Sequence, residues 1–240
     1  MKIIVTSDIH FPYEHPDMFE FIQDVLDLYN YKFDLHVDVG DIVDFHSFSN
    51  WDKRPDLHGA SRELQLAREK VARFAAMFKK IPHLGVIGNH CCRIARKANQ
   101  TGIPEEALRP LEEIIGVPWK LEEQLIIATP THGTNKTRNL YVIHDGGSDL
   151  RKEVVRSNMN MIAGHYHYTA YIDFQVTAND LVWGLQMPCL IDKSSSAFAY
   201  ARRQIKRPII GCAIIDSGHP RLVPMPLDKK GRYKKKELVA

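Results

Sequence analysis

Cysteine is scarce in this sequence, and the few cysteines do not form a recognisable metal or disulfide motif. The four residues are Cys91, Cys92, Cys189 and Cys212, and none of them forms a CxxC pair. Neighbouring cysteines rarely bond to each other, because the disulfide geometry is strained. The pattern argues against a thiolate zinc site and a disulfide framework, and it favours a reducing, cytoplasmic location.

Long apolar runs are also missing. No stretch of about 18 uninterrupted apolar residues occurs, so the sequence predicts no membrane span. The N-terminal stretch MKIIVTSDIH has one lysine and too short an apolar run for a signal peptide. Charge of one sign is modest, with a formal net charge of +3, and a basic run at 229–236 accounts for much of that excess.

What remains is an ordinary composition. Hydrophobic residues make up 44% and charged residues 25%, which excludes disorder and collagen-like repeats but selects no activity. At 240 residues we expect one domain over 1–226, with a loop or cap at 46–59. A solvated basic tail is expected at 227–240.

Strand and helix patterns alternate along the chain. The predicted order is strand 2–7, helix 17–29, strand 34–39, helix 61–80, strand 83–87, helix 93–99, helix 105–115, strand 140–143, strand 159–163, and strand-rich pieces at 169–176, 180–183 and 208–215. The first part is typical of an α/β sheet, and the last pieces predict a second sheet packed on the first.

Polar clusters follow five of the predicted strands, where each strand ends. They are Asp8-Ile9-His10, Gly40-Asp41-Ile42-Val43-Asp44, Gly88-Asn89-His90, His144-Asp145-Gly146 and Gly164-His165-Tyr166-His167. Open α/β sheets carry their sites at the carboxyl ends of strands, so these side chains are expected to converge. Mixed carboxylate, amide and imidazole donors suit Mn²⁺, Fe or Zn²⁺.

Such a donor set points to a pair of metal ions. Two ions about 3.5–4 Å apart activate water and stabilise both oxygens of a displacement at phosphorus. One carboxylate must touch both ions to offset their repulsion, and Asp41 is the candidate. We predict that Gly40, Gly88 and Gly164 let the backbone turn sharply at the strand ends without a Cβ clash.

In this order, the motifs DxH, GDxxD, GNH, a histidine before glycine, and GHxH resemble the calcineurin-like metallophosphoesterase family, in a stand-alone bacterial or phage form. The resemblance covers residues 1–167. It implies a four-layer α/β/β/α sandwich, in which helices flank two mixed sheets and the metal site lies at the strand ends.

The resemblance also implies roles for the motif residues. One ion would be held by Asp8, His10, Asp41 and His167, and the other by Asp41, Asn89, His144 and His165. His90 would lie near the phosphate as general acid or transition-state stabiliser. Two divalent ions are expected, Mn²⁺ first, with Fe, Zn²⁺ or Ni²⁺ as alternatives.

Two positions depart from the family pattern. Cys91 stands where many relatives have an acidic residue that orients the histidine, so Asp44 or Asp145 is expected to orient His90 instead. Asp145 follows His144, where relatives often have a small residue, and its position predicts a side chain close to the ions.

Substrate contacts are predicted near the motifs, at His46, Arg54 and Arg93. His46 either faces the phosphate or caps its loop. Arg93, with the neighbouring Arg96 and Lys97, either attracts phosphate or forms a solvated helix face. Arg54 either clamps a base together with the nearby tryptophan or packs under the loop.

Hydrolysis of a nucleotide or nucleic-acid phosphodiester by metal-activated water is the leading hypothesis. A phosphomonoesterase, either a protein phosphatase or a nucleotidase, would use the same site. A scaffold of the same fold that binds a partner protein without catalysis would have lost ligands, whereas none is missing here. A metallo-β-lactamase-like hydrolase would need an HxHxDH cluster, which the sequence lacks.

Overall fold

The computed structural model of the chain describes residues 1–50, 57–130, 137–177, 180–192 and 207–239. Its elements run in the order β1 (Lys2–Thr6), α1 (Met18–Leu28), β2 (Leu35–Asp38), α2 (Ala60–Met77), β3 (His83–Val86), α3 (Arg93–Gln100), α4 (Leu111–Ile115), β4 (Leu121–Glu122), β5 (Gln124–Pro130), β6 (Thr137–Ile143), α5 (Leu150–Ser157), β7 (Asn160–Ala163), β8 (Tyr171–Val176), β9 (Leu181–Gln186), β10 (Gly211–Asp216) and β11 (His219–Pro224). Short 3-10 helices lie at His46–Phe48, Glu105–Ala107 and Lys235–Glu237.

The strands form two mixed sheets. The first has the order β11-β10-β1-β2-β3-β4, in which β1 to β4 are parallel and β10 lies antiparallel to β1. The second has the order β5-β6-β7-β9-β8, in which β6, β7 and β9 are parallel. Both sheets therefore present several parallel carboxyl ends.

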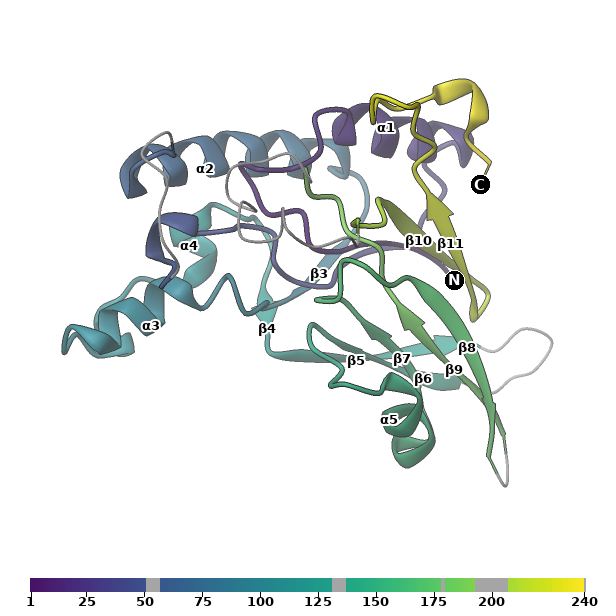
Figure 1. Cartoon of the computed structure of the whole chain (residues 1–240). Helices are drawn as coiled ribbons and strands as arrows, with labels where there is room; N and C mark the ends of the chain where they lie inside the picture. The colour runs from purple at the N-terminus through teal and green to yellow at the C-terminus, as the bar shows by residue number, and fades with distance from the viewer. Residues whose placement is uncertain (51–56, 131–136, 178–179, 193–206, 240) are drawn as a thin grey trace.

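Alternating side chains of β1 explain how the layers stack. Ile3 and Val5 lie in an apolar cluster shared with the second sheet, whereas Ile4 faces the cluster that α1 and α2 cover. A third cluster, containing Leu150 and Val154, packs α5 on the outer face of the second sheet. The predicted α/β/β/α sandwich is confirmed, and Figure 1 shows its layers from α1 and α2 down to α5.

Some predicted elements differ from the structure. The helix expected over 105–115 is split into a 3-10 turn and α4, because Pro110 disfavours the helical conformation of the residue before it. The patterns do not predict β5, α5 or β11. In β11, Pro220 and Pro224 lower strand propensity, but at the edge of a sheet a proline removes no ladder hydrogen bond.

The C-terminal segment contacts α1 through a few side chains, although most of its described residues are exposed. Arg232 forms a bidentate ion pair with Asp17, and the Tyr233 hydroxyl donates to Asp24 Oδ2 at 3.0 Å. The Tyr233 ring also packs edge to face against the Phe21 ring, with 5.6 Å between the ring centroids. Acidic side chains on α1 thus recruit part of the basic run to the body of the fold. Within the described part of the chain, no helix combines the length and apolar character that a bilayer crossing requires.

Candidate metal centre

All seven predicted ligands meet at the carboxyl ends of five strands. Asp8 and His10 follow β1, Asp41 follows β2, Asn89 follows β3, His144 follows β6, and His165 and His167 follow β7. Because β1, β2 and β3 are parallel neighbours in one sheet, and β6 and β7 in the other, these loops open at the same edge of the sandwich.

One group of donors consists of Asp8, His10 and His167, and their ligand atoms lie within 4.8 Å of one another. His167 Nε2 is 3.0 Å from Asp8 Oδ1 and 3.2 Å from His10 Nε2. Two imidazole nitrogens that face each other at this distance require a proton or a cation between them. This group therefore suits a bound cation.

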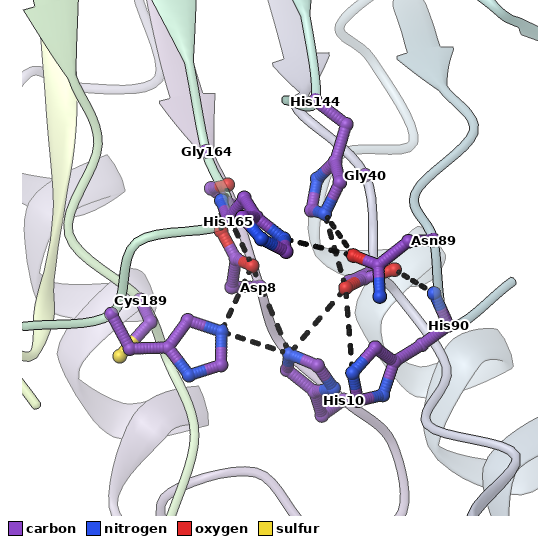
Figure 2. Close-up of polar contacts among 12 residues, drawn as sticks. Asp8, His10, Gly40, Asn89, His90, His144, Gly164, His165 and Cys189 are labelled. Carbon is purple, nitrogen blue, oxygen red and sulfur yellow. Dashed lines mark hydrogen bonds and ion pairs between the residues drawn. The ribbon is translucent and has the colours of Figure 1, made fainter. Parts of the chain in front are cut away.

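A second group surrounds Asn89. Its Oδ1 lies 3.0 Å from His144 Nε2 and 2.9 Å from His165 Nδ1, and Asp41 Oδ2 lies 3.1 Å from His144 Nε2 (Figure 2). Asp41 Oδ2 is also 3.9 Å from His10 Nε2 in the first group. Asp41 thus occupies the position between the two groups that a bridging carboxylate requires.

Buried charge makes this site favourable for cations. Asp8, Asp41 and Asp44 are each 1% exposed. Burial alone would raise the pKa of these carboxyls, but the surrounding histidines hold the pKa of each well below its usual range. Several ionised carboxylates in one interior site need compensating positive charge, which divalent ions provide.

The pKa values of two histidines at the site shift in the opposite direction, upward. Burial by itself would lower the pKa of His10, but hydrogen bonds to Asp44 and Asp8 raise that pKa to about 9. For His144, the charge and hydrogen bond of Asp41 likewise outweigh burial and raise the pKa to about 10. The buried carboxylates thus favour positive charge on the neighbouring side chains, and the same charge would favour divalent ions, so the residues fit a metal centre.

Four of the ligand residues have an unusual backbone conformation. Asp8, His10, Asp41 and His165 adopt left-handed φ values of 52°, 57°, 52° and 72°, respectively. Residues with a side chain rarely occupy this region, and such strain concentrates at functional sites. The backbone itself thus directs these side chains toward the centre.

The three motif glycines serve two different purposes. Gly40 has a φ of +96° and makes the predicted sharp turn. Gly88 and Gly164 do not have left-handed φ values, and what they provide is the other part of the prediction, the absence of a Cβ clash. A Cβ at Gly88 would lie 2.1 Å from Asp41 Oδ1, and one at Gly164 would lie 2.7 Å from Asp8 Oδ2. These two glycines let the backbone approach the carboxylates closely.

Gly88→Ala is expected to displace Asp41, because the added methyl group has no room. Overpacking of this kind costs about 1–3 kcal/mol in the free energy of unfolding. Urea unfolding and the metal content of the purified protein would measure both effects. Gly59→Ala is the control, since a Cβ there meets nothing within 4 Å. Unchanged stability and metal content in Gly88→Ala would contradict this explanation.

Several supporting residues were not predicted. His144 Nδ1 faces the carbonyl of Val39 at 2.8 Å, which directs Nε2 toward Asp41. Ser7 donates to Asp8 Oδ2, and the Asp38 carboxylate accepts a hydrogen bond from the Gly40 amide at 3.0 Å. Their sequence signal is weak, because it consists only of a polar residue beside a motif at a strand end.

His90 lies beside the two donor groups, and Asp44 holds it there. Its Nδ1 is 3.4 Å from Asp44 Oδ2, and its Nε2 is 3.1 Å from Arg93 Nη2. Arg93 Nη1 also donates to Asp44 Oδ1 at 2.7 Å. Burial lowers the pKa of His90, while Asp41 and Asp44 act against that shift.

The two departures from the family pattern are now explained. Cys91 is buried in the core under the helices, where burial raises the pKa of its thiol. Asp145 is exposed and accepts a hydrogen bond from the Gly147 amide at 2.9 Å, so it closes a turn. Of the two carboxylates expected to orient His90, Asp44 is the one in contact, and the prediction that Asp145 faces the ions is wrong.

The other predicted substrate residue that the structure describes is His46. It is buried, and its Nδ1 lies 3.9 Å from Asp44 Oδ1. Its backbone amide donates to Glu63 Oε1 at 2.6 Å, so Glu63 anchors the start of this loop. Arg54 and its neighbour Trp51 lie outside the described residues.

Comparison with known proteins gives a family and a fold. A family model described as calcineurin-like phosphoesterase matches residues 1–185. No curated protein sequence matches the chain. The hypothetical protein PH1004 from Pyrococcus horikoshii OT3 is 12% identical, with a TM-score of 0.55 over 95% of this chain and 89% of that one.

Two further solved structures are more distant. Vps29 from Chaetomium thermophilum is 9% identical, with a TM-score of 0.48 over 98% of this chain and 95% of that one. Nuclease MPE from Pseudomonas putida is 12% identical, with a TM-score of 0.37 over 93% and 87% of the two chains. At such identities the similarity concerns the fold alone.

Proposed function

The chain belongs to the calcineurin-like phosphoesterase family, and from this premise we propose that it hydrolyses phosphodiesters of nucleotides or nucleic acid at a centre of two divalent ions. The observation that carries the proposal is the position of Asp41 between two donor groups, 3.1 Å from His144 Nε2 and 3.9 Å from His10 Nε2. A single ion would need only one of these groups.

Asp8, His10, Asp41 and His167 would hold one ion, and Asp41, Asn89, His144 and His165 the other. Mn²⁺ is the first choice, and Fe, Zn²⁺ or Ni²⁺ suit the same donors. When bound, such ions supply Lewis acidity toward the phosphoryl oxygens and toward water.

We assign proton transfer to His90. Asp44 faces its Nδ1, and Nε2, which accepts from Arg93 Nη2 in this structure, is the nitrogen that would exchange a proton with the ester. Arg93 lies beside that nitrogen and brings positive charge to the place where the phosphate binds. The Asp44 contacts to both side chains keep them in one arrangement.

The diester preference rests on the surroundings of Asn89. This residue lines a cavity together with Arg93, Arg96 and Lys97, so cationic side chains extend beyond a single phosphate site. The same centre would also serve a phosphomonoesterase. The scaffold alternative is disfavoured because all seven donors converge among the described residues.

Hydrolysis of bis-p-nitrophenyl phosphate and p-nitrophenyl phosphate, with and without Mn²⁺, tests the proposal. Faster release of p-nitrophenolate from the diester is expected, with loss of activity after chelation. Preferential cleavage of the monoester would favour the phosphomonoesterase. If both esters stay intact although two ions bind, the scaffold alternative replaces the proposal.

Metal binding is also expected to stabilise the fold. Mn²⁺ at about 100 times its dissociation constant adds about 2.7 kcal/mol for each site that exists only in the folded chain. For a protein of this size, the stabilisation from one such site corresponds to a rise in Tm of roughly 5–10 °C. Thermal unfolding with Mn²⁺ and after EDTA treatment measures the difference. Equal Tm values would contradict a resident metal centre.

A further inference from the structure

Helix α3 carries a basic face that begins beside the metal centre. Arg93, Arg96, Lys97 and Gln100 recur at spacings of three and four residues, so they share one side of the helix. The sequence from 92 to 104 contains no acidic residue. Figure 1 shows α3 at the side of the molecule, away from the second sheet, and Arg96, Lys97 and Gln100 are exposed.

This basic face borders a cavity of about 160 Å³, which is also lined by Asn89, one of the predicted metal ligands. The other lining residues are the four polar residues of α3 and Phe48, Ser49 and Asn50. The cavity therefore brings the polar side chains of α3 together with one predicted metal ligand.

The cations along this wall differ in their contacts. Arg93 is paired with Asp44, and Arg96 donates to the carbonyl of Asn89. Lys97 has a single long contact, 3.4 Å to Gln100 Oε1. Within the ranges that the structure describes, neither Arg96 nor Lys97 pairs with a carboxylate. Their charge is therefore available to an anion in the cavity.

The length of the wall indicates which anion fits. From Arg93 to Gln100 the helix rises by about 10 Å, which is two turns. A free nucleotide places its phosphates next to one another, whereas a nucleic-acid strand continues past the reacting phosphate. Phe48 also lines the cavity, and an aromatic side chain beside cationic ones is a feature of single-strand sites.

We infer that Arg96 and Lys97 bind phosphates that flank the reacting phosphate of a single-stranded nucleic acid. The inference rests on the proposed function, since it takes the reacting phosphate to lie at the metal centre. It assigns the basic face of α3 to the substrate backbone, and binding there depends on charge rather than on base sequence.

Fluorescence anisotropy with a labelled fifteen-nucleotide thymidine strand tests this inference on the full chain. Each phosphate contact to a single strand contributes about 0.7 to the slope of log K against log salt. The double variant R96Q/K97Q should therefore bind with a slope less steep by about 1.4. The charge-preserving variant R96K/K97R should keep the wild-type slope.

The matched control is K79Q/K80Q, which removes the same charge just before the amino end of β3, at the opposite edge of the sheet. It should leave the slope unchanged. An unchanged slope in R96Q/K97Q, or an equal loss in the control, would overturn the inference. Displacement of the strand by inorganic pyrophosphate at an equal concentration of phosphate groups would also overturn it, and would assign the cavity to short polyphosphates.

A denaturing gel of the probe after each titration keeps the two proposals separate. If the slope changes as expected while the probe and the p-nitrophenyl esters stay intact, the α3 site stands and the proposed hydrolysis fails. If the esters are cleaved while the slope does not change, the hydrolysis stands and the α3 site fails.

Discussion

Asp41→Asn is expected to lower kcat/KM for bis-p-nitrophenyl phosphate by at least about 10³-fold. Replacing a residue that only supports a metal ligand already lowers metal affinity or activity by about 10–100-fold, and the loss of a ligand should be larger. The substitution keeps the shape of the side chain but removes the negative charge between His10 and His144. Two neighbouring cations then lack the shared anion that offsets their repulsion. We also expect the variant to hold fewer than two ions per chain.

Asp145→Asn is the matched control for this prediction. Its carboxylate is exposed and bonds to the Gly147 amide, although it directly follows a predicted ligand in the sequence. Activity and metal content should stay close to those of the wild type. Wild-type metal content and activity in Asp41→Asn would refute the bridging role.

For His90→Ala, we expect kcat to fall by about 10²–10⁴-fold, the usual contribution of a positioned acid or base. Metal content should remain unchanged, because His90 is outside the proposed ligand set. The loss should be larger for an alkyl ester than for a p-nitrophenyl ester, since p-nitrophenolate leaves readily without a proton. Steady-state kinetics on both esters, with metal analysis, measures these differences.

His219→Ala removes an exposed histidine from β11 and should leave kcat unchanged. An equal loss on both esters in His90→Ala would show that His90 stabilises charge without transferring a proton. Loss of bound metal together with activity would instead make His90 a ligand.

The fold was predictable where side-chain patterns are strong. β1, β2 and β3 are short apolar runs that end at polar residues, and the structure has them within one or two residues of the predicted bounds. Elements with weak side-chain patterns were not predicted. α5 buries only Leu150 and Val154, so its helical period is hardly visible in the sequence.

The candidate site was predictable in its composition but not in its support. Asp44 appeared as one of two carboxylates able to orient His90, and distance decided between them. The contact of Arg93 with both side chains depends on how α3 leaves the loop after β3. No spacing in the sequence carries that information.

By itself, the sequence determined the donor chemistry and its location at strand ends, because residue type and strand period are local properties. The tertiary structure decided what depends on distance between remote segments. The pairing of β1 with β2 and β6 with β7 brings Asp41 between the two donor groups, and the missing side chain at Gly88 admits its carboxylate. The packing of the tail on α1 depends on Asp17 and Arg232, which are 215 residues apart. Contacts of this kind arise only when the chain is folded, since their energy depends on a geometry that no local pattern specifies.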